Sequence, residues 1–403
     1  MNPLVEGRPG LARVLAALDG AGEEARIVGG AVRDWLIGRG LRSDIDIATT
    51  ALPDEITRRA HAAGLKPVPT GIEHGTITVI AEGEPYEVTT LREDVETDGR
   101  RARVVFGRSW DHDAQRRDFT MNALYLTRTG EVVDLVGGVE DARAGRVRFI
   151  GDADTRIRED YLRILRLFRF HASFGRGPLD ADALAAAARH RAGLDQLSRE
   201  RVRAELMKLL VAPRAAETLA QMQAAELLAP VLGREGEVAT FARLAEVEAA
   251  LGLPPDAVRR LGALAVREPA DAEALREGLR LSNTEAARLI ALAGPAPTPG
   301  MCEKGQKAFL YRMGREAFQD RALIAFARAG APLADEGWRA LAAIAADWPL
   351  PVFPLKAADF LTRGMTPGPA LGAALKRAEE AWVEAGFPKG EAALADIVAG
   401  AVG

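Results

Sequence analysis

The most regular pattern of hydrophobic and polar residues is the stretch 43–48, where two aspartates alternate with two isoleucines. An alternation of period two is typical of a half-buried β-strand, because residues i and i+2 project from the same face of a strand. The pattern predicts that Asp44 and Asp46 share one face while Ile45 and Ile47 fill a core behind them. Comparable short runs predict further strands at 26–28, 76–80, 86–90 and 132–135.

Apolar positions spaced three and four residues apart predict helices over much of the remaining chain. These helices are expected at 11–18, from 30, from 53, from 116, at 156–170 and at 198–208. Beyond residue 210 the sequence is rich in Ala and Leu, with proline-containing segments at 294–300 and 348–351. Because proline cannot continue a helix, these segments predict breaks in a long series of helices.

Length and composition favour a globular chain with more than one domain. The 403 residues are 48% hydrophobic and 27% charged, which is typical of globular proteins and too long for one compact core. The net charge of -4 excludes a uniformly basic nucleic-acid-binding coat. It leaves room for a local basic groove, because the field depends on how charges are distributed.

The single cysteine and the short length of the apolar runs indicate the cellular compartment of the protein. Cys302 stands alone, so intramolecular disulfides and cysteine-based zinc sites are excluded, which suits a reducing cytoplasm. Residues 1–10 lack an apolar core and include Glu6, unlike a secretory signal. No apolar run approaches about 18 residues, so we expect no membrane span and a cytoplasmic location.

Two neighbouring segments indicate phosphate and metal chemistry. Paired carboxylates such as Asp44 and Asp46 repel each other unless a cation is present, and Mg²⁺ prefers one or two carboxylates plus substrate phosphates. Upstream, Gly29-Gly30 follows a short strand and opens a helix with Arg33 one turn in. Such a turn lets the backbone approach phosphate, and the guanidinium can bond its oxygens. Taken singly, the acidic pair is equally compatible with a solvated edge strand, and a Gly-Gly turn is more often a plain tight turn.

A later helix carries a regular series of charges. Asp160, Arg163, Arg166 and Arg169 recur every three residues, so each neighbours the next on the helix surface. The usual outcome of such a run is a solvated face. Three arginines beside one acid are nevertheless poorly balanced without an anionic partner.

Together these segments resemble the signature of the tRNA nucleotidyltransferase/poly(A) polymerase family, in the class shared by bacteria and eukaryotes. The family belongs to the polymerase β-like nucleotidyltransferases. The resemblance is carried by Gly-Gly-Ala-Val-Arg-Asp at 29–34, Asp-Ile-Asp-Ile-Ala-Thr at 44–49, Arg-Arg-Asp-Phe-Thr-Met-Asn-Ala-Leu at 116–124 and Glu-Asp-x-x-Arg at 159–163. It covers residues 26–208 strongly and a tail segment at 356–372 weakly.

The resemblance implies a fold and a domain division. It implies an α+β nucleotidyltransferase head of a small mixed sheet with helices at 1–150. A helical neck that recognises the base is expected at 151–215. An all-helical body and tail at 216–403 would contact tRNA.

The resemblance also implies an activity, the template-independent addition or repair of the 3′-terminal CCA of tRNA from CTP and ATP. Two Mg²⁺ ions about 3.5–4 Å apart would serve the transfer. Asp44 and Asp46 would be catalytic metal ligands. Glu87 is the candidate third carboxylate, and a surface glutamate on an edge strand explains it equally well.

The remaining site residues follow from the same resemblance. Gly30, Arg33 and Arg117 would meet phosphate, and Asp118, with Asn122 as a second candidate, would meet the ribose hydroxyls. Arg166 and Arg169 would orient the base and the triphosphate, with Glu205 as a supporting partner for an arginine.

Asp160 and Arg163 would select the base. A carboxylate accepts from the exocyclic amine and a guanidinium donates to the ring nitrogen that cytosine and adenine share. Uracil and guanine would mismatch both groups, at about 1–3 kcal/mol each.

Three alternatives stay open. A poly(A) polymerase of the same family shares these motifs, although the tail lacks a long basic extension. An enzyme that adds only CC or only A is also compatible; the loop at 98–107 argues mildly against CC alone, while Arg101 stands where many members have His. The third alternative is a non-catalytic module that binds RNA or nucleotides.

Overall fold

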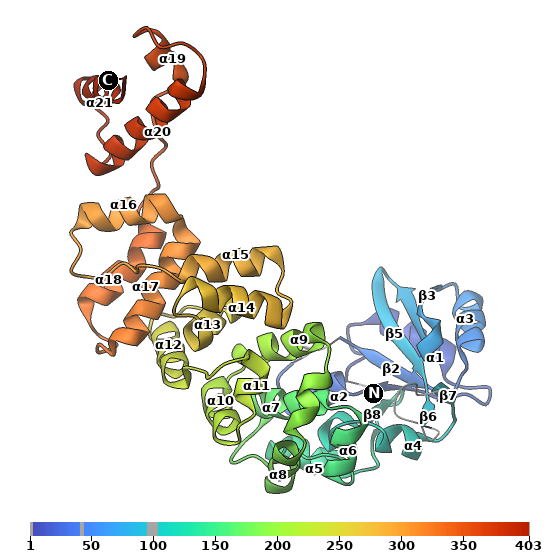
Figure 1. Ribbon diagram of the computed structural model, residues 1–403. Coiled ribbons are helices and arrows are strands. Elements are labelled where there is room, and N and C mark those ends of the chain that lie inside the picture. Colours follow the sequence, from blue (N-terminus) through green and yellow to red (C-terminus); the bar gives the residue numbers. More distant parts are fainter. Residues whose placement is uncertain (1–2, 41–43, 95–103, 403) are drawn as a thin grey trace. The chain divides into compact units, whose positions relative to one another are not determined.

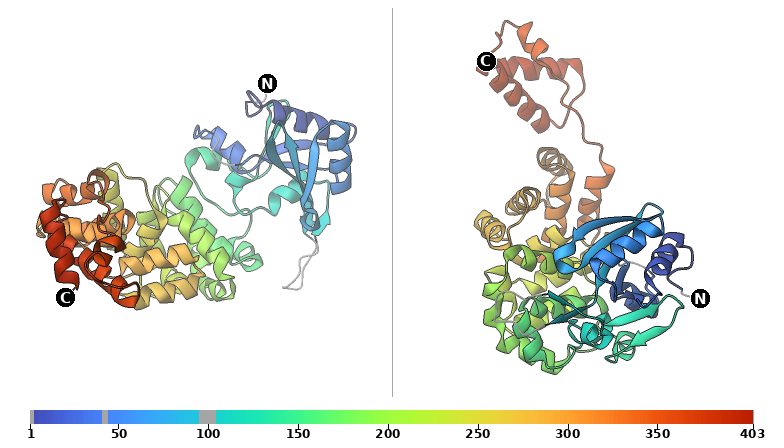
Figure 2. Two further views of the ribbon diagram at one scale, coloured as in Figure 1. Left: turned by 90° about the horizontal axis from the view of Figure 1, so that it is seen from above. Right: turned by 90° about the vertical axis from the view of Figure 1, so that its right-hand side faces the viewer.

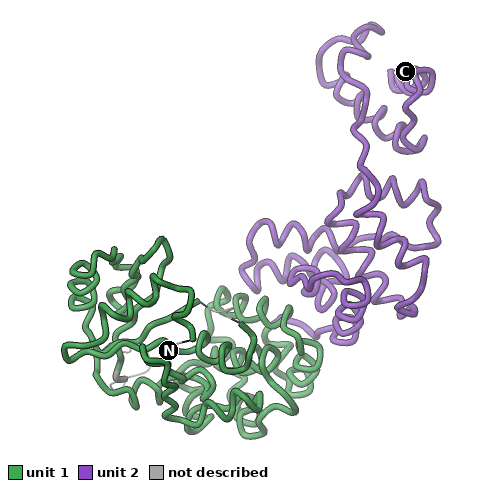
Figure 3. Tube along the Cα trace, turned by 180° about the vertical axis from the view of Figure 1, so that it is seen from behind, with its two compact units in different colours: residues 1–231 green, residues 232–403 purple. Residues whose placement is uncertain are grey.

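The computed structural model describes residues 3–40, 44–94 and 104–402 (Figure 1). The chain forms two compact units, residues 1–231 and 232–403, coloured separately in Figure 3. The expected boundaries at 150 and 215 both fall inside the first unit and stay predictions.

The first unit starts with a mixed sheet, as the sequence predicted. Within the described residues its order is β3-β4-β5-β2-β1-β8-β9, and every neighbouring pair is antiparallel except β2 and β5, which are parallel. The strands are β1 (Ala25–Val28), β2 (Asp46–Thr49), β3 (Lys66–Gly71), β4 (Thr76–Ala81), β5 (Glu84–Thr90), β8 (Leu124–Thr127) and β9 (Val132–Asp134). A separate hairpin joins β6 (Arg92–Asp94) and β7 (Val104–Phe106).

Short helices flank this sheet. Helices α1 (Pro9–Leu18) and α3 (Pro53–Ala62) pack on each other and on β4 (Figure 2). Helix α1 buries Leu11, Val14, Leu15 and Leu18, the i, i+3, i+4, i+7 spacing of an amphipathic helix. The other helices of this region are α2 (Gly30–Leu36), α4 (Trp110–Gln115) and α5 (Gly138–Ala144).

Helices make up the rest of both units. The first unit continues with α6 (Ala153–Glu159), α7 (Leu162–Phe174), α8 (Ala181–Arg189), α9 (Arg199–Leu210), α10 (Ala215–Ala224) and α11 (Leu228–Leu232). The second contains α12 (Val238–Ala250), α13 (Ala257–Ala265), α14 (Pro269–Leu279), α15 (Asn283–Leu292), α16 (Glu303–Met313), α17 (Arg315–Ala329), α18 (Glu336–Asp347), α19 (Ala357–Leu361), α20 (Pro369–Glu384) and α21 (Glu391–Val402). Both predicted proline breaks are confirmed, between α15 and α16 and between α18 and α19.

The prediction of one helix over 156–170 was wrong at a single position. Helix α6 ends at Glu159, Asp160 is extended (φ -156°, ψ 107°), and α7 begins at Leu162. The Asp160 carboxylate accepts a 3.1 Å hydrogen bond from the Leu162 backbone N–H. Such a local side-chain bond competes with the helical ladder and ends α6 there.

The helix predicted from residue 116 was also wrong. Helix α4 stops at Gln115, and the chain passes through a short 3₁₀ turn, η2 (Thr120–Asn122), into β8. Phe119 is extended and buried between Phe149 and Phe170, with ring centroids 4.9 and 5.2 Å away. Tertiary packing of this aromatic side chain outweighs the weak local preference for helix.

The strand predicted at 43–48 is shorter than expected. β2 begins at Asp46, so Asp44 lies in the segment that leads into it. Ile47 is buried as predicted, whereas Ile45 is only half-buried. In the part of the chain that the structure covers, every helix is too short or too polar to cross a lipid bilayer.

Candidate functional site

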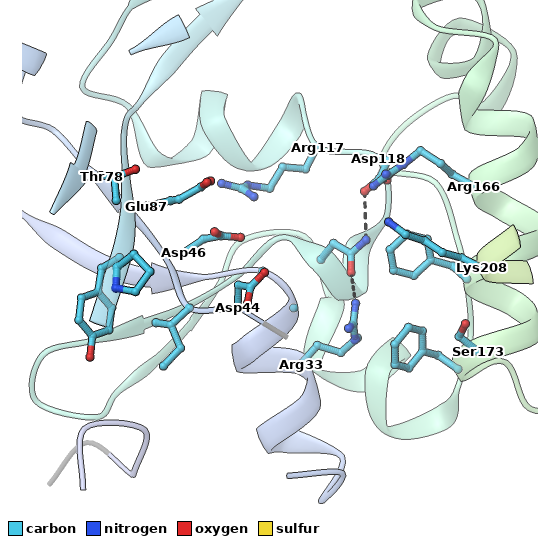
Figure 4. Close-up of a pocket in the computed structure, with 18 of the residues that line it drawn as sticks. Arg33, Asp44, Asp46, Thr78, Glu87, Arg117, Asp118, Arg166, Ser173 and Lys208 are labelled. Carbon is cyan, nitrogen blue, oxygen red and sulfur yellow. Dashed lines mark hydrogen bonds and ion pairs between the residues drawn. The ribbon is translucent and has the colours of Figure 1, made fainter. Parts of the chain in front are cut away.

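A pocket of about 1600 Å³ in the first unit is lined by every predicted site residue (Figure 4). These residues come from distant parts of the sequence: the α2 turn, β2 and β5, the segment after α4, and α7. They are Gly30, Arg33, Asp44, Asp46, Glu87, Arg117, Asp118, Asp160, Arg163, Arg166 and Arg169. The fold therefore brings acidic and basic groups from both ends of the first unit to one cavity.

The acidic side of the pocket is formed by two parallel strands. Asp46 opens β2 and is the register partner of Glu87 in β5, while Asp44 lies two residues before Asp46. Figure 4 shows the three carboxylates gathered together, with Arg117 extending toward Glu87. Because β5 lies between β4 and β2, the expectation of an edge strand was wrong, although the Glu87 side chain itself is exposed.

Asp46 has the most perturbed carboxyl group in this cluster. Its side chain opens onto the pocket, yet the surrounding protein withdraws it from bulk water. This burial and the negative charge of Glu87 raise its pKa to about 6; Arg117 opposes the shift and Asp44 adds to it. Crowded carboxylates of this kind favour a proton or a cation as a fourth partner.

The donor set fits a hard divalent cation that shares its coordination with a ligand. Asp44 and Asp46 offer oxygen donors on one side of the pocket. Among the described residues, no group of three or more His, Cys, Asp or Glu side chains is close enough to hold a metal alone. The remaining ligands would have to be substrate phosphates and water, which is the usual arrangement for Mg²⁺.

The glycine turn and Arg33 differ in one respect from an open phosphate-binding site. Gly29 adopts φ 77°, ψ -128°, a conformation that favours glycine, directly before α2. Arg33 is only 4% exposed. Its Nε and Nη2 donate to Asp34 at 3.0 and 2.8 Å, and its Nη1 donates to Asn122. The guanidinium thus already holds protein partners within the pocket wall.

Arg117 is fixed from behind by a buried carboxylate. Its Nε and Nη2 donate to Asp113 Oδ2 at 3.1 and 2.9 Å, and the Tyr125 hydroxyl donates to the same oxygen at 2.9 Å. Burial alone would raise the pKa of Asp113, but the charges of Arg117 and Arg116 hold it below its ordinary value. Arg117 is therefore held as a fixed cation beside the acidic cluster.

Asp118 is 9% exposed and pairs with a residue of the helical region. Arg166 donates to its Oδ2 through Nε and Nη2, at 2.7 and 2.5 Å. Burial would raise the pKa of Asp118, but the charge of Arg166 outweighs it and keeps the pKa below its ordinary value. Asp118 is consequently a buried anion that connects the segment after α4 to α7.

Asp160 and Arg163 both face the pocket but hold separate partners. Arg201 of α9 donates to Asp160 Oδ2 at 2.6 Å. Arg163 donates to the Arg156 carbonyl at 2.7 Å and to the Glu159 carboxylate. The two proposed base contacts are thus oriented independently of each other.

Helix α9 contributes groups that sequence reasoning had left out of the pocket. Arg201 and Lys208 line the cavity, and Glu205 between them pairs with Arg169, which confirms the expected support for an arginine. Their i, i+4, i+7 spacing on one helical face was the available signal. Phe170 and Phe174 of α7 also line the pocket, whereas Arg101 lies outside the described residues.

Two family models match the chain. Residues 25–148 match the poly A polymerase head domain, and residues 178–236 match the probable RNA and SrmB-binding site of polymerase A. The two matched segments contain the acidic cluster, Arg117, Asp118 and α9.

Curated relatives match the first half of the chain. CCA tRNA nucleotidyltransferase 1, mitochondrial, of Danio rerio is 45% identical over 199 residues, 49% of this chain and 46% of that protein. The CCA-adding enzyme of Leuconostoc mesenteroides is 43% identical over 208 residues, 51% of this chain and 50% of that protein. The chain thus matches about half the length of these relatives.

Solved structures match along nearly the whole chain. The Bacillus stearothermophilus CCA-adding enzyme, solved in complex with CTP, is 29% identical with a TM-score of 0.75, covering 96% of this chain and 94% of that one. The Thermotoga maritima CCA-adding enzyme, solved in complex with a tRNA, is 19% identical with a TM-score of 0.69, covering 99% and 96%. The second likeness concerns the fold alone.

Proposed function

We propose that this chain adds or repairs the 3′-terminal CCA of tRNA from CTP and ATP. The matches of residues 25–148 and 178–236 to the two polymerase A models, and the relatives named as CCA-adding enzymes, support the proposal. One observation carries this proposal: Asp44 and Asp46, just before and at the start of β2, line one cavity with the arginines of α7. A nucleotide between them would have phosphates near a metal-binding side and its base near α7. The relatives named as CCA-adding enzymes support the choice of tRNA, CTP and ATP.

Members of this family generally use a divalent metal, and we propose Mg²⁺ held by Asp44 and Asp46, with Glu87 beside them. Bound Mg²⁺ supplies neutralisation of phosphate charge and a lower pKa for the attacking 3′-hydroxyl of tRNA. Burial and the charge of Glu87 raise the pKa of Asp46, and a bound cation would relieve the repulsion between the two carboxylates. Pyrophosphate would leave as the nucleotidyl group is transferred.

The other pocket residues would bind and orient the nucleotide. Arg117, fixed by Asp113, would bond phosphate oxygens, and Gly30 would let the backbone approach them. Arg166 and Arg169 would orient the base and triphosphate from α7. Asp118 would act near the ribose, and its engagement with Arg166 is considered below.

Base selection would rest on Asp160 and Arg163. A carboxylate that accepts and a guanidinium that donates match cytosine and adenine, and oppose uracil and guanine. Arg201 holds the Asp160 carboxylate in place from α9, so this acceptor is preoriented before a nucleotide arrives. An amino-acid template would thereby replace a nucleic-acid template.

The test is incubation of a tRNA that ends at the discriminator base with CTP, ATP or both, followed by denaturing gel analysis. Full activity adds two residues with CTP and completes CCA when both are present. A poly(A) polymerase gives a long ladder with ATP alone, and stopping after CC or adding only A identifies a restricted enzyme. Absence of any incorporation, both on this tRNA and on a tRNA that already ends in CC, identifies a non-catalytic binding module and contradicts the proposal.

The domain roles and the compartment complete the proposal. We assign nucleotidyl transfer to 1–150, base recognition to 151–215 and tRNA binding to 216–403. A cytoplasmic location rests on the single cysteine, Cys302.

A further inference from the structure

Asn122 lies where charged side chains from two different elements approach each other. Its amide oxygen accepts a 2.6 Å hydrogen bond from Arg33 Nη1 of α2, and its amide nitrogen donates over 3.1 Å to Asp118 Oδ1. Both bonds are drawn as dashed lines in Figure 4. Since an amide offers an acceptor at one end and donors at the other, these partners fix its orientation.

Both oxygens of the Asp118 carboxylate already accept hydrogen bonds from protein donors. Oδ1 accepts from Asn122 and from the Phe119 backbone N–H at 2.8 Å, and Oδ2 accepts from both Nε and Nη2 of Arg166. An ionised carboxylate offers about four lone-pair positions. A ribose hydroxyl could therefore bind Asp118 only by displacing one of these donors, and the carboxylate is better placed to hold Arg166.

Asn122 separates a buried cation from a buried anion. Arg33 and Asp118 are 4% and 9% exposed, and the neutral amide stands between them. With the amide removed, the Arg33 guanidinium and the Asp118 carboxylate would attract each other across a poorly solvated gap. That attraction would compete with the ion pair between Asp118 and Arg166.

We propose that Asn122 is a positioning residue that sets the affinity of the pocket for nucleoside triphosphates by keeping Asp118 engaged with Arg166. The amide acts through two neighbours: it spaces Arg33 of α2 from Asp118, and so leaves Arg166 of α7 fixed over the cavity. The inference rests on the proposed function, because it takes CTP and ATP as the ligands.

Charged groups face this contact from each element that surrounds it. Most of these groups are already paired: Asp34 with Arg33, Arg166 with Asp118, and Glu205 with Arg169. These ion pairs determine the electrostatic surroundings of a charge introduced at position 122. The charged groups include Arg33, Asp34 and Arg39 in and after α2, Arg117 beside Asp118, Asp141 of α5, which accepts from Thr120 of η2, Arg166 and Arg169 of α7, and Glu205 and Lys208 of α9. A carboxylate at 122 would thus have one cation, Arg33, on one side and one anion, Asp118, on the other.

The isosteric variant Asn122→Asp tests the proposal. It places two carboxylate oxygens near 3.1 Å apart, where two negative charges repel. We expect the Kd for CTP, measured calorimetrically with Mg²⁺ and without tRNA, to rise about tenfold or more over wild type at roughly pH 8. A protonated Asp can donate as the amide does, so the ratio to wild type should fall back at about pH 6.

The matched control is Asn283→Asp, the same chemical change at an exposed position of α15 in the second unit, which should leave the Kd unchanged. The Kd of each variant is divided by the wild-type Kd at the same pH, so that effects of other titrating groups in the pocket cancel. If Asn122→Asp does not fold, the double variant Asp118→Asn, Asn122→Asp (the swap) is measured instead, because it keeps one amide and one carboxylate. The swap should fold yet bind CTP weakly at both pH values, because Arg166 then faces a neutral amide.

Three results would overturn the inference: wild-type affinity in Asn122→Asp at about pH 8, a loss of affinity that acid does not reverse, or wild-type affinity in the swap. Each leaves the proposed function standing, provided that the wild-type protein binds CTP. A wild-type protein that binds neither CTP nor ATP contradicts the proposed function, and this inference with it.

Discussion

Asp44, Asp46 and Glu87 are three carboxylates that the fold gathers at one side of the pocket. Burial, and after it the negative charge of Glu87, raise the pKa of Asp46. Arg117 offsets only part of that repulsion. The divalent cation that we propose at Asp44 and Asp46 would offset the rest.

Removing one of these carboxylates should remove activity without unfolding the protein. Asp44 is exposed to the pocket and begins no regular element, so Asp44→Ala should leave the thermal midpoint nearly unchanged. We expect kcat for CTP incorporation into tRNA to fall at least about a thousandfold, since charge neutralisation is lost. The control is Asp195→Asn, at an exposed position in the 3₁₀ turn Arg191–Gln196. Retention of full activity by Asp44→Ala would show that the metal assignment is wrong.

The pairing of Asp160 with Arg201 makes base choice testable at a single atom. Asp160→Asn keeps an oxygen to accept from the Leu162 N–H but can place an NH₂ group where a carboxylate oxygen stood. A donor there suits uracil, so the UTP to CTP ratio of kcat/KM should rise about tenfold or more. Single-nucleotide incorporation assays measure the ratio. Unchanged rejection of UTP would exclude Asp160 from base recognition.

Among the elements, the turn η2 carries Asn122 and depends on a close approach by α5. A Cβ added at Gly138 would collide with the Thr120 carbonyl oxygen and approach the Leu124 side chain. The absence of a side chain at Gly138 therefore lets α5 pack against η2 and hold the segment that bears Asp118 and Asn122. The functional segment is positioned by backbone packing as much as by its own hydrogen bonds.

Gly138→Ala should therefore destabilise the first unit by about 1–3 kcal/mol, through overpacking of backbone against backbone. Urea denaturation measures the change. The matched control is Gly278→Ala in α14, where a Cβ meets nothing within 4 Å. That change should stabilise by roughly 0.4–1 kcal/mol, because it reduces the freedom of the unfolded chain. Equal effects of the two substitutions would show that the approach at Gly138 is not tight.

Stability of the whole molecule should depend on pH through a buried histidine. His171 of α7 is 2% exposed, and burial together with Arg214 lowers its pKa from 6.5 to about 4. Above about pH 6.5 the imidazole is neutral in both states and its burial is fully tolerated. Between about pH 6.5 and 4 the unfolded chain binds a proton that the folded chain does not, so stability falls by up to roughly 1.4 kcal/mol per pH unit.

Denaturation curves across this range check the prediction in wild type and His171→Gln, which has no titrating ring at this position. The variant should lose the part of the pH dependence that His171 supplies. His61→Gln, an exposed position of α3, controls for the loss of an imidazole. An identical pH dependence in His171→Gln and wild type would show that another group causes the acid sensitivity.

At the scale of the whole chain, the sequence determined element types and the identity of the pocket residues. Period-two and helical spacings located most strands and helices, because burial of one face acts locally along the chain. The family signature then pointed to the residues of the pocket. Sequence reasoning failed at Asp160 and around Phe119, where a local side-chain bond and distant aromatic packing overrode the helical pattern.

Tertiary structure alone decided which charges are partners. The parallel pairing that sets Glu87 beside Asp46 joins strands separated by two others in the chain, and no local pattern specifies that register. Likewise, Asp118 bonds Asn122 and Arg166, and Asp160 bonds Arg201. The Arg166 and Arg201 partners come from other elements. Coulombic and hydrogen-bond energies depend on distances between side chains, and only folding fixes those distances.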